Sequence, residues 1–322
     1  MALGNTEFVI KTLCISFAAF ALTIILIRLA GNKLPKDQGR EFAVAGAASQ
    51  GKIRGAGILM MCVFAALGGL AGGFSNVVTT CNLAVIFSML TGYLDDRSKT
   101  PWSELKKGIL DLVICLFAAI TIMINEPDVV GLNFGGKFTA IHPVLYVILA
   151  AFFLWLMINA VNCADGIDGL CAGLSINSML AACVFAVVLG KGAEVLPQCA
   201  VMTAVLLAYL CFNSEPSSVL MGDAGSRPLG LFLGIIFLRM GNALFAVPLC
   251  IVLLADGLLG LLKLSVLRVL KTKSFMKNLR TPIHDHLRKN LGVSNAQVRF
   301  RFNLAQVMVS IVFFVIWMYL AG

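Results

Sequence analysis

The chain has 322 residues, of which 59% are hydrophobic and only 13% are charged, and its formal net charge is +9. Together with a mean hydropathy of +0.93, this composition excludes an ordinary soluble globular domain. Because a helix needs about 20 mainly apolar residues to cross a bilayer, the repeated apolar runs predict an all-α, polytopic integral membrane protein.

Ten apolar segments are predicted to span the membrane. In chain order they are 8–30, 56–73, 77–93, 108–125, 141–161, 169–190, 200–212, 229–240, 243–262 and 304–320. The first run lacks a basic leader and a small-residue cleavage site, so it is predicted to be a retained helix. No internal repeat or linker marks a boundary, which predicts one transmembrane domain over residues 1–322.

The basic residues predict the orientation. If the connections after the odd-numbered segments face the cytoplasm, they hold 21 of the 25 Lys and Arg residues, and the other side keeps only Lys11, Lys137, Lys191 and Arg239. Cytoplasmic connections of membrane proteins carry an excess of Lys and Arg. This distribution predicts that both termini lie outside and that four polar clusters share the cytoplasmic face.

The most informative cluster, residues 159–170, holds two carboxamides, Asn159 and Asn162, and two acids, Asp165 and Asp168. A charge at the depth of a bilayer costs roughly 2.5 to 3.5 kcal/mol or more, so acids beside an apolar run usually face a wet cavity and serve a function. The two acids would share one face of an opening helical turn. A helix cap is the plainer interpretation, but it needs only Asp165.

A second cluster ends another apolar segment with Asp95 and Asp96, followed by Lys99. Adjacent carboxylates repel each other, so they are held together usefully only by a cation or a shared proton. This favours Mg²⁺ with phosphate, or a general base. The alternative is a solvated helix end, with Lys99 as an anchor at the membrane surface.

A third cluster places Asp223 between Gly222 and Gly225, just before an apolar segment. Backbone N–H groups at a helix start can hold anionic oxygens, and Mg²⁺ prefers one or two carboxylates completed by phosphate and water. The alternative interpretation is an ordinary tight turn.

The fourth cluster holds His284 and His286, two of the three histidines; His142 lies alone at the end of a span. Near phosphates and carboxylates, imidazoles fit better as hydrogen-bond partners of a pyrophosphate than as zinc ligands, although zinc stays the alternative. The surrounding basic run, residues 263–301, is expected to orient the chain and to contact anionic lipid headgroups.

Acids, histidines and glycine-rich turns on one face suit a diphosphate substrate, Mg²⁺ and an acceptor confined to the membrane. At these same residues the chain resembles the polyprenyl-phosphate N-acetylhexosamine-1-phosphate transferase family. The matching stretches are 93–96, 159–170, 221–226 and 282–286, in the same order and spacing. The proline-led histidine motif and the run 297–302 are most similar to the branch that acts on a MurNAc-pentapeptide. The family's ten-helix topology agrees with the predicted orientation.

The resemblance implies that undecaprenyl phosphate attacks the β-phosphate of UDP-MurNAc-pentapeptide, giving lipid I for peptidoglycan synthesis and UMP. The reaction would require Mg²⁺ and take place at the cytoplasmic face of a bacterial plasma membrane. By matching position, Asp223 is the metal ligand, and Asp95 and Asp96 receive or activate the lipid phosphate, with Asp95 as the base. The resemblance also implies that the wall of the nucleotide site is formed by Asn162, Asp165 and Asp168. The implied contacts to phosphates or sugar are Lys99, Asn213, His284 and His286. Membrane lipids and a second copy of the chain are further candidate partners, and no feature indicates nucleic acid.

Three positions depart from the family's pattern. Asp285 interrupts the usual run of three histidines, and Leu220 stands where the family commonly has a phenylalanine suited to stacking on uracil. Residues 50–57 are a loose version of the family's threonine-proline-glycine-glycine segment, in which Lys52 or Arg54 is expected to serve the phosphates.

Two other functions stay open. An enzyme of the same family that transfers GlcNAc-1-phosphate to the lipid carrier would use the same motifs. An ion-coupled secondary transporter would instead place acids deep inside spans and use paired broken helices. Only Asp111 and Asp256 lie within apolar runs, and the sequence leaves the role of Asp256 undecided.

Overall fold

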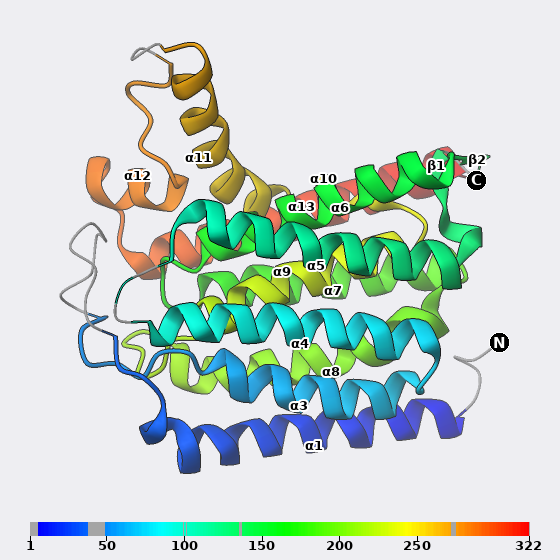
Figure 1. The fold of residues 1–322 in the computed structure, drawn as a ribbon, viewed down its shortest axis with the longest axis horizontal. Helices are drawn as coiled ribbons and strands as arrows, with labels where there is room; N and C mark the ends of the chain where they lie inside the picture. The colour runs from blue at the N-terminus through cyan, green and yellow to red at the C-terminus, as the bar shows by residue number, and fades with distance from the viewer. Residues whose placement is uncertain are drawn as a thin grey trace.

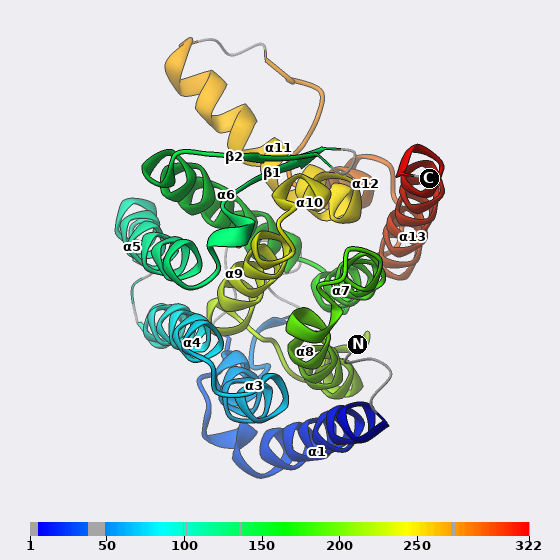
Figure 2. The ribbon, with the colours of Figure 1, turned by 90° about the vertical axis from the view of Figure 1, so that its right-hand side faces the viewer.

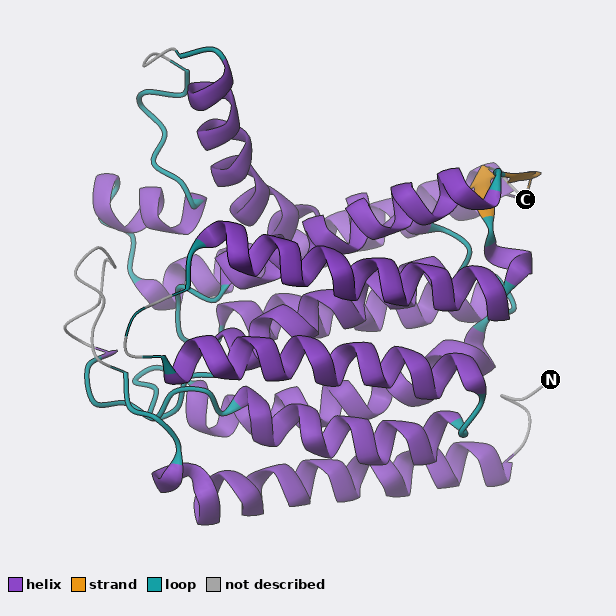
Figure 3. Ribbon diagram, viewed as in Figure 1, coloured by secondary structure: helices purple, strands orange, loops and turns teal. Residues whose placement is uncertain are grey.

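The computed structural model describes residues 6–37, 49–98, 100, 102–134, 137–271 and 275–321. The described chain is almost entirely helical (Figure 3). Its longer helices are α1 (Thr6–Ala30), α3 (Gly57–Gly72), α4 (Asn76–Arg97), α5 (Glu104–Asn125), α6 (Pro143–Ala164), α7 (Leu170–Val188), α8 (Gly192–Asn213), α9 (Asp223–Arg239), α11 (Ile251–Val269) and α13 (Asn295–Ala321).

Shorter elements connect these helices. They are η2 (Gly31–Lys33), η3 (Pro127–Val129), η4 (Ala243–Phe245), α10 (Ala246–Leu249), α12 (Ile283–Asn290), and the strands β1 (Gly131–Phe134) and β2 (Lys137–Ala140). The two strands form an antiparallel hairpin in which Gly131 is the partner of Ala140. The hairpin lies at the end of the bundle where α1 begins and α13 ends (Figure 1).

Helix α9 forms the centre of the bundle, and every one of its residues is buried. Figure 2 shows it surrounded by its neighbours, and it packs chiefly on α4, α6 and α3. Glycines permit this packing, because a Cβ at Gly230 would overlap the backbone of Met157 and Ile158 on α6. Close backbone approach through small residues is how membrane helices pack without help from the hydrophobic effect.

The prediction of an all-α polytopic membrane protein is confirmed. Seven of the described helices are long and apolar enough to cross a membrane, or eight if the bent pair of α10 and α11 forms one span. Helix α3, with 16 residues, is a shorter apolar helix. The number of spans that length and composition support is therefore lower than the ten predicted.

The helix predicted over 243–262 is not continuous. The segments Ala243–Leu249 and Ile251–Val269 meet at an angle of 97°. Gln306 of α13 stabilises this break, because its side chain accepts from Val252 N at 3.0 Å and donates to Pro248 O at 3.1 Å. Such partners replace the backbone hydrogen bonds that a broken helix loses. Helix α11 consequently leaves the bundle (Figure 1).

Three predicted boundaries also shift. Helix α8 begins at Gly192 and continues through Pro197, α9 begins at Asp223 rather than at 229, and α13 begins at Asn295 rather than at 304. The first two of these helices each contain a proline at the sixth residue, Pro197 in α8 and Pro228 in α9, which removes one intrahelical hydrogen bond. With these boundaries, the polar clusters lie at the ends of helices. These helix ends lie at the end of the bundle near α12, opposite the β-hairpin (Figure 1).

Candidate active site

A cavity of about 580 Å³ opens at this end of the bundle. Its wall combines the predicted clusters around Asn162, Asp168, Asp223 and His284 with Arg54. The lining residues also include Asp37, Ser49, Lys52, Asp165, Leu220, Gly222, Asp285 and Arg288. Segments that are far apart in the sequence therefore share one polar cavity.

Asp223, the first residue of α9, is surrounded by three donors. Lys107 Nζ lies 3.4 Å from Oδ2, Asn162 Nδ2 donates to Oδ1 at 3.3 Å, and Arg54 lies 4.0 Å from Oδ1. Asn162 also donates to Ser226 Oγ at 2.9 Å. This carboxylate is thus held in place from α5, from α6 and from the segment before α3.

Asp95 and Asp96 end α4 and are tied to different cations. Lys107 Nζ lies 2.7 Å from Asp95 Oδ2, while Arg54 Nε donates to Asp96 Oδ1 at 2.8 Å. The second Asp96 oxygen accepts from Ala224 N at 3.0 Å. Burial works against the charge of Arg54, but the carboxylates of Asp96, Asp223 and Asp37 together outweigh burial and raise the pKa of Arg54. Neither acid lines the cavity itself, and the cations connect both to Asp223.

Asp165 caps the C-terminal end of α6 and lines the cavity. Burial, and then the negative charge of Asp223, raise the pKa of Asp165 well above its usual range. A cation bound between these carboxylates would reverse that shift, because it favours their ionised forms. Among the described residues, no group of three or more His, Cys, Asp or Glu side chains could hold a metal ion. One or two carboxylates suit Mg²⁺, which takes its other ligands from phosphate and water.

Asp168 connects two loops beside the cavity. Its Oδ2 accepts from Ser217 N at 3.0 Å and lies 3.4 Å from Lys52 Nζ, which donates to Ser217 Oγ at 2.8 Å. Arg299 donates to the Asp168 carbonyl at 3.0 Å. Asp168 therefore holds Lys52 at the cavity wall.

Asn213 lies behind the cavity rather than in its wall. It is 3% exposed, accepts from Gly169 N and donates to Val219 O, each at 2.8 Å. This geometry supports a role in joining the two loops, and a direct contact to substrate stays a prediction. Lys99 lies outside the described residues.

The two histidines of α12 differ in their surroundings. His284 is buried, lines the cavity and bonds Asp256 through Nδ1. His286 does not line the cavity, and its Nδ1 accepts from Arg280 N at 3.3 Å. Asp285 lines the cavity 3.7 Å from His284 Nε2.

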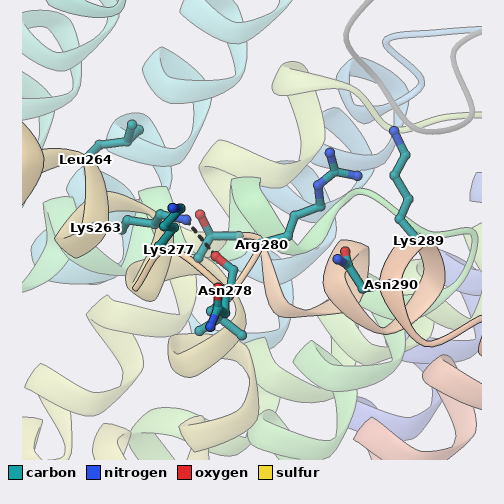
Figure 4. A pocket seen from close by; sticks show the side chains of 9 residues that line it. Lys263, Leu264, Lys277, Asn278, Arg280, Lys289 and Asn290 are labelled. Atoms are coloured by element: carbon teal, nitrogen blue, oxygen red, sulfur yellow. Dashed lines mark hydrogen bonds between the residues drawn. The ribbon is translucent and has the colours of Figure 1, made fainter. Parts of the chain in front are cut away.

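A larger cavity of about 1010 Å³ lies between the end of α11 and α12, and Figure 4 shows the side chains around it. Lys263, Lys277, Arg280 and Lys289 line it, and no acid does. Lys263 Nζ donates to Leu279 O at 2.6 Å, which joins α11 to the segment just before α12. This cavity is built from the basic run that the sequence assigns to lipid contact.

The sequence did not predict a role in the site for Lys107 or Asp256. Lys107 joins Asp95 to Asp223 from the second turn of α5, and the available signal was its place in the same connection as the acid pair. The role of Asp256 had no signal, because its partner His284 lies 28 residues later, on α12.

Two comparisons relate the chain to known proteins. The sequence model of Glycosyl transferase family 4 matches residues 78–241. The chain is 34% identical to the phospho-N-acetylmuramoyl-pentapeptide-transferase of Treponema pallidum (strain Nichols), over 92% of this chain and 86% of that protein. It is 25% identical to the protein of the same name from Dictyoglomus thermophilum, over 96% and 99% of the two chains. The corresponding protein of Streptococcus pyogenes is 27% identical over 81% and 80%.

Proposed function

The chain belongs to the family of the phospho-N-acetylmuramoyl-pentapeptide-transferases, and from this premise we propose that it catalyses the formation of lipid I. In this reaction a phosphate oxygen of undecaprenyl phosphate attacks the β-phosphorus of UDP-MurNAc-pentapeptide. The bond between the two phosphates of the nucleotide breaks, and UMP leaves. The product is the lipid-linked intermediate of peptidoglycan synthesis.

The observation that carries this proposal is the charge arrangement around Asp223. A cavity at the end of a membrane bundle combines Asp165 and Asp223 with Lys52 and Arg54. Phosphoryl transfer needs little covalent chemistry from the protein, since positioning and neutralisation of charge supply most of the catalysis. A cavity with both signs of charge can hold a diphosphate and a divalent cation together.

The lysine and arginine residues are the groups that would receive phosphates. Lys107 and Arg54 are held by Asp95 and Asp96. A lipid phosphate that approaches these cations competes with the two acids for the same donors. Asp95 is then released to accept a proton from a lipid phosphate that still carries one, which is the role proposed for this base.

The donor set fits Mg²⁺, and we assign Asp223 as its ligand, with Asp165 beside it. When bound, the ion would neutralise charge on the diphosphate and assist departure of UMP. Asn162 orients Asp223 through its 3.3 Å hydrogen bond. His284 reaches the cavity from α12, where it is suited to contact a phosphate or the sugar.

The orientation proposed for the chain places this cavity at the cytoplasmic face of a bacterial plasma membrane. The basic residues at this end support it, since Lys and Arg concentrate on the cytoplasmic side. In the same orientation, the cations of the larger cavity meet anionic lipid headgroups beside the exposed apolar residues Leu262 and Leu264 of α11. Assembly as a homodimer stays a prediction.

The test offers purified protein two uracil-labelled nucleotides, UDP-MurNAc-pentapeptide and UDP-GlcNAc, each with a short-chain polyprenyl phosphate. We expect labelled UMP from the first nucleotide only, and only when lipid phosphate and Mg²⁺ are present. Release of UMP from UDP-GlcNAc alone would replace the proposed substrate by the GlcNAc nucleotide. Release from neither would refute the transfer reaction.

A further inference from the structure

Asp256 is a buried acid that does not line the cavity, and it bonds His284, a histidine that does. Asp256 of α11 is 0% exposed, and both of its carboxylate oxygens are used by one residue. Oδ1 accepts from the backbone N of His284 at 2.8 Å, and Oδ2 lies 2.6 Å from its Nδ1. The contact joins the helix that leaves the bundle to the short helix α12.

The backbone is arranged to bring this acid close to the cavity. Gly257 follows Asp256, and a Cβ at Gly257 would overlap the carbonyl group of Ala160 on α6. The glycine therefore lets α11 lie directly on α6, just before the loop that carries Asp165. Asp256 reaches His284 from that position.

The opposite edge of the imidazole faces the loop of Asp165. A Cβ at Gly166 would overlap His284 Nε2, so only glycine leaves room for the ring there. Asp285 Oδ1, held by Arg288 at 3.4 Å, lies 3.7 Å from the same nitrogen. The ring is thus confined from behind by Asp256 and in front by Gly166, with Nε2 toward the cavity.

A carboxylate can only accept hydrogen bonds, so the Nδ1 atom of His284 must carry a proton. The Nε2 atom is then the nitrogen that is free to act on a bound group. If Asp256 served only to cap the start of α12, one carboxylate oxygen that accepts from a backbone N–H would be enough. The second oxygen is used on the imidazole itself, which a cap does not explain.

We propose that Asp256 is a positioning residue for catalysis, which fixes both the orientation of His284 and the proton on Nδ1, so that Nε2 is presented to the phosphate or sugar of the bound nucleotide. The catalytic part of this proposal rests on the proposed function. The hydrogen bonds between Asp256 and His284 do not depend on that function. Partners that hold a functional histidine through its other ring nitrogen typically change activity roughly 10- to 100-fold when they are mutated.

The first test is nuclear magnetic resonance of the full chain labelled with ¹⁵N-histidine. The chain has only three histidines, so His142→Gln and His286→Gln identify the His284 signals by subtraction. At a pH where the ring is neutral, we expect the proton on Nδ1 in the wild type. In Asp256→Asn the amide group can donate to Nδ1, and we expect the proton on Nε2. A wild-type ring protonated on Nε2 alone would overturn the proposal, even if the variant failed to fold.

The second test is kinetic. Asp256→Asn should lower kcat by roughly 10- to 100-fold with little change in KM for the nucleotide. In a His284→Ala background the same substitution should have almost no further effect, because residues that act as a unit are not additive. A full additional loss in that background would show that Asp256 acts only on the fold. Absence of UMP release by the wild type would refute the proposed function and leave the resonance test of the pair intact.

Discussion

The two ends of α9 both hold charged groups inside the bundle, yet they differ in what surrounds those groups. Asp223 and Arg239 lie roughly 24 Å apart along the helix axis. Arg239 pairs with Glu126 through two nitrogens, at 3.0 Å and 2.8 Å, and donates to Gln198 at 3.1 Å. Gln198 in turn donates to Asn82 at 3.0 Å. At this end the charges of Arg239 and Glu126 are paired with each other.

At the other end the carboxylates Asp165 and Asp223 line a cavity, and the pKa of Asp165 is raised by burial and by the charge of its neighbour. A closed network holds helices together, whereas like charges kept close around a cavity cost stability unless a cation binds there. We infer from the comparison that buried charges paired only with one another serve the packing of the helices, whereas those that line the cavity, or hold residues that do, serve function.

The substitution expected to have the largest effect is Asp223→Asn. It removes the carboxylate assigned to the metal and should lower turnover by roughly 10²- to 10³-fold, with a weaker dependence on Mg²⁺. UMP release over a range of Mg²⁺ concentrations measures both effects. Asp128→Asn is the control at the opposite end, where Asp128 is exposed and pairs with Lys191, and it should leave the rate unchanged. Near-normal turnover in Asp223→Asn would contradict the metal assignment.

His284→Ala should have the next largest effect. Loss of an imidazole that acts on the reacting group should cost roughly 10²-fold in kcat. His142, beside the first residue of α6, lies at the end away from the cavity, so His142→Ala serves as the comparison. Equal rates for the two variants would contradict a role for His284 in the reaction.

Glu126→Gln tests the other end of α9, where a substitution should lower stability and leave turnover unchanged. The variant leaves the guanidinium of Arg239 buried without a countercharge, which costs roughly 3 to 5 kcal/mol for a buried pair. Thermal unfolding in detergent should shift to lower temperature, while the rate per folded molecule stays the same. A drop in that rate with unchanged stability would mean that the network around Arg239 is functional.

The smallest effect is expected at the larger cavity. Replacement of Lys277, Arg280 and Lys289 by Gln should weaken retention of anionic lipid, since each cation near a charged surface contributes about 1 kcal/mol. Native mass spectrometry of protein taken from vesicles with anionic and neutral lipids measures this. Lys11→Gln, an exposed lysine of α1, is the matched control. Equal lipid retention by the triple variant and the wild type would contradict a lipid contact here.

Much of the site could be predicted because ionisable residues are rare in such an apolar chain. Asp165, Asp168 and Asp223 stand out beside apolar runs, and all three line one cavity. The histidines were found in the same way, but only His284 reaches the cavity wall. A pattern in the sequence identifies which residues are unusual, whereas the direction in which each side chain points depends on the packing of the helices.

The bend before α11 could not be predicted, since residues 243–262 are continuously apolar and their composition does not distinguish one straight helix from two. The partner that stabilises the bend, Gln306, lies on α13 and becomes a partner only in the folded chain. The contact between Asp256 and His284 likewise forms only when α11 and α12 come together in the folded chain. Contacts between segments that are distant in the sequence leave no local pattern.

The segment that carries Asp223 is confined on both sides by backbone. A Cβ at Gly57 would overlap Gly225, and a Cβ at Gly92 would overlap the carbonyl group of Asp223. At these two contacts backbone lies directly against backbone, which restricts movement of the segment that carries Asp223. We therefore expect selection among nucleotide sugars of different size to depend on the side chains that α12 contributes to the cavity wall, His284, Asp285 and Arg288.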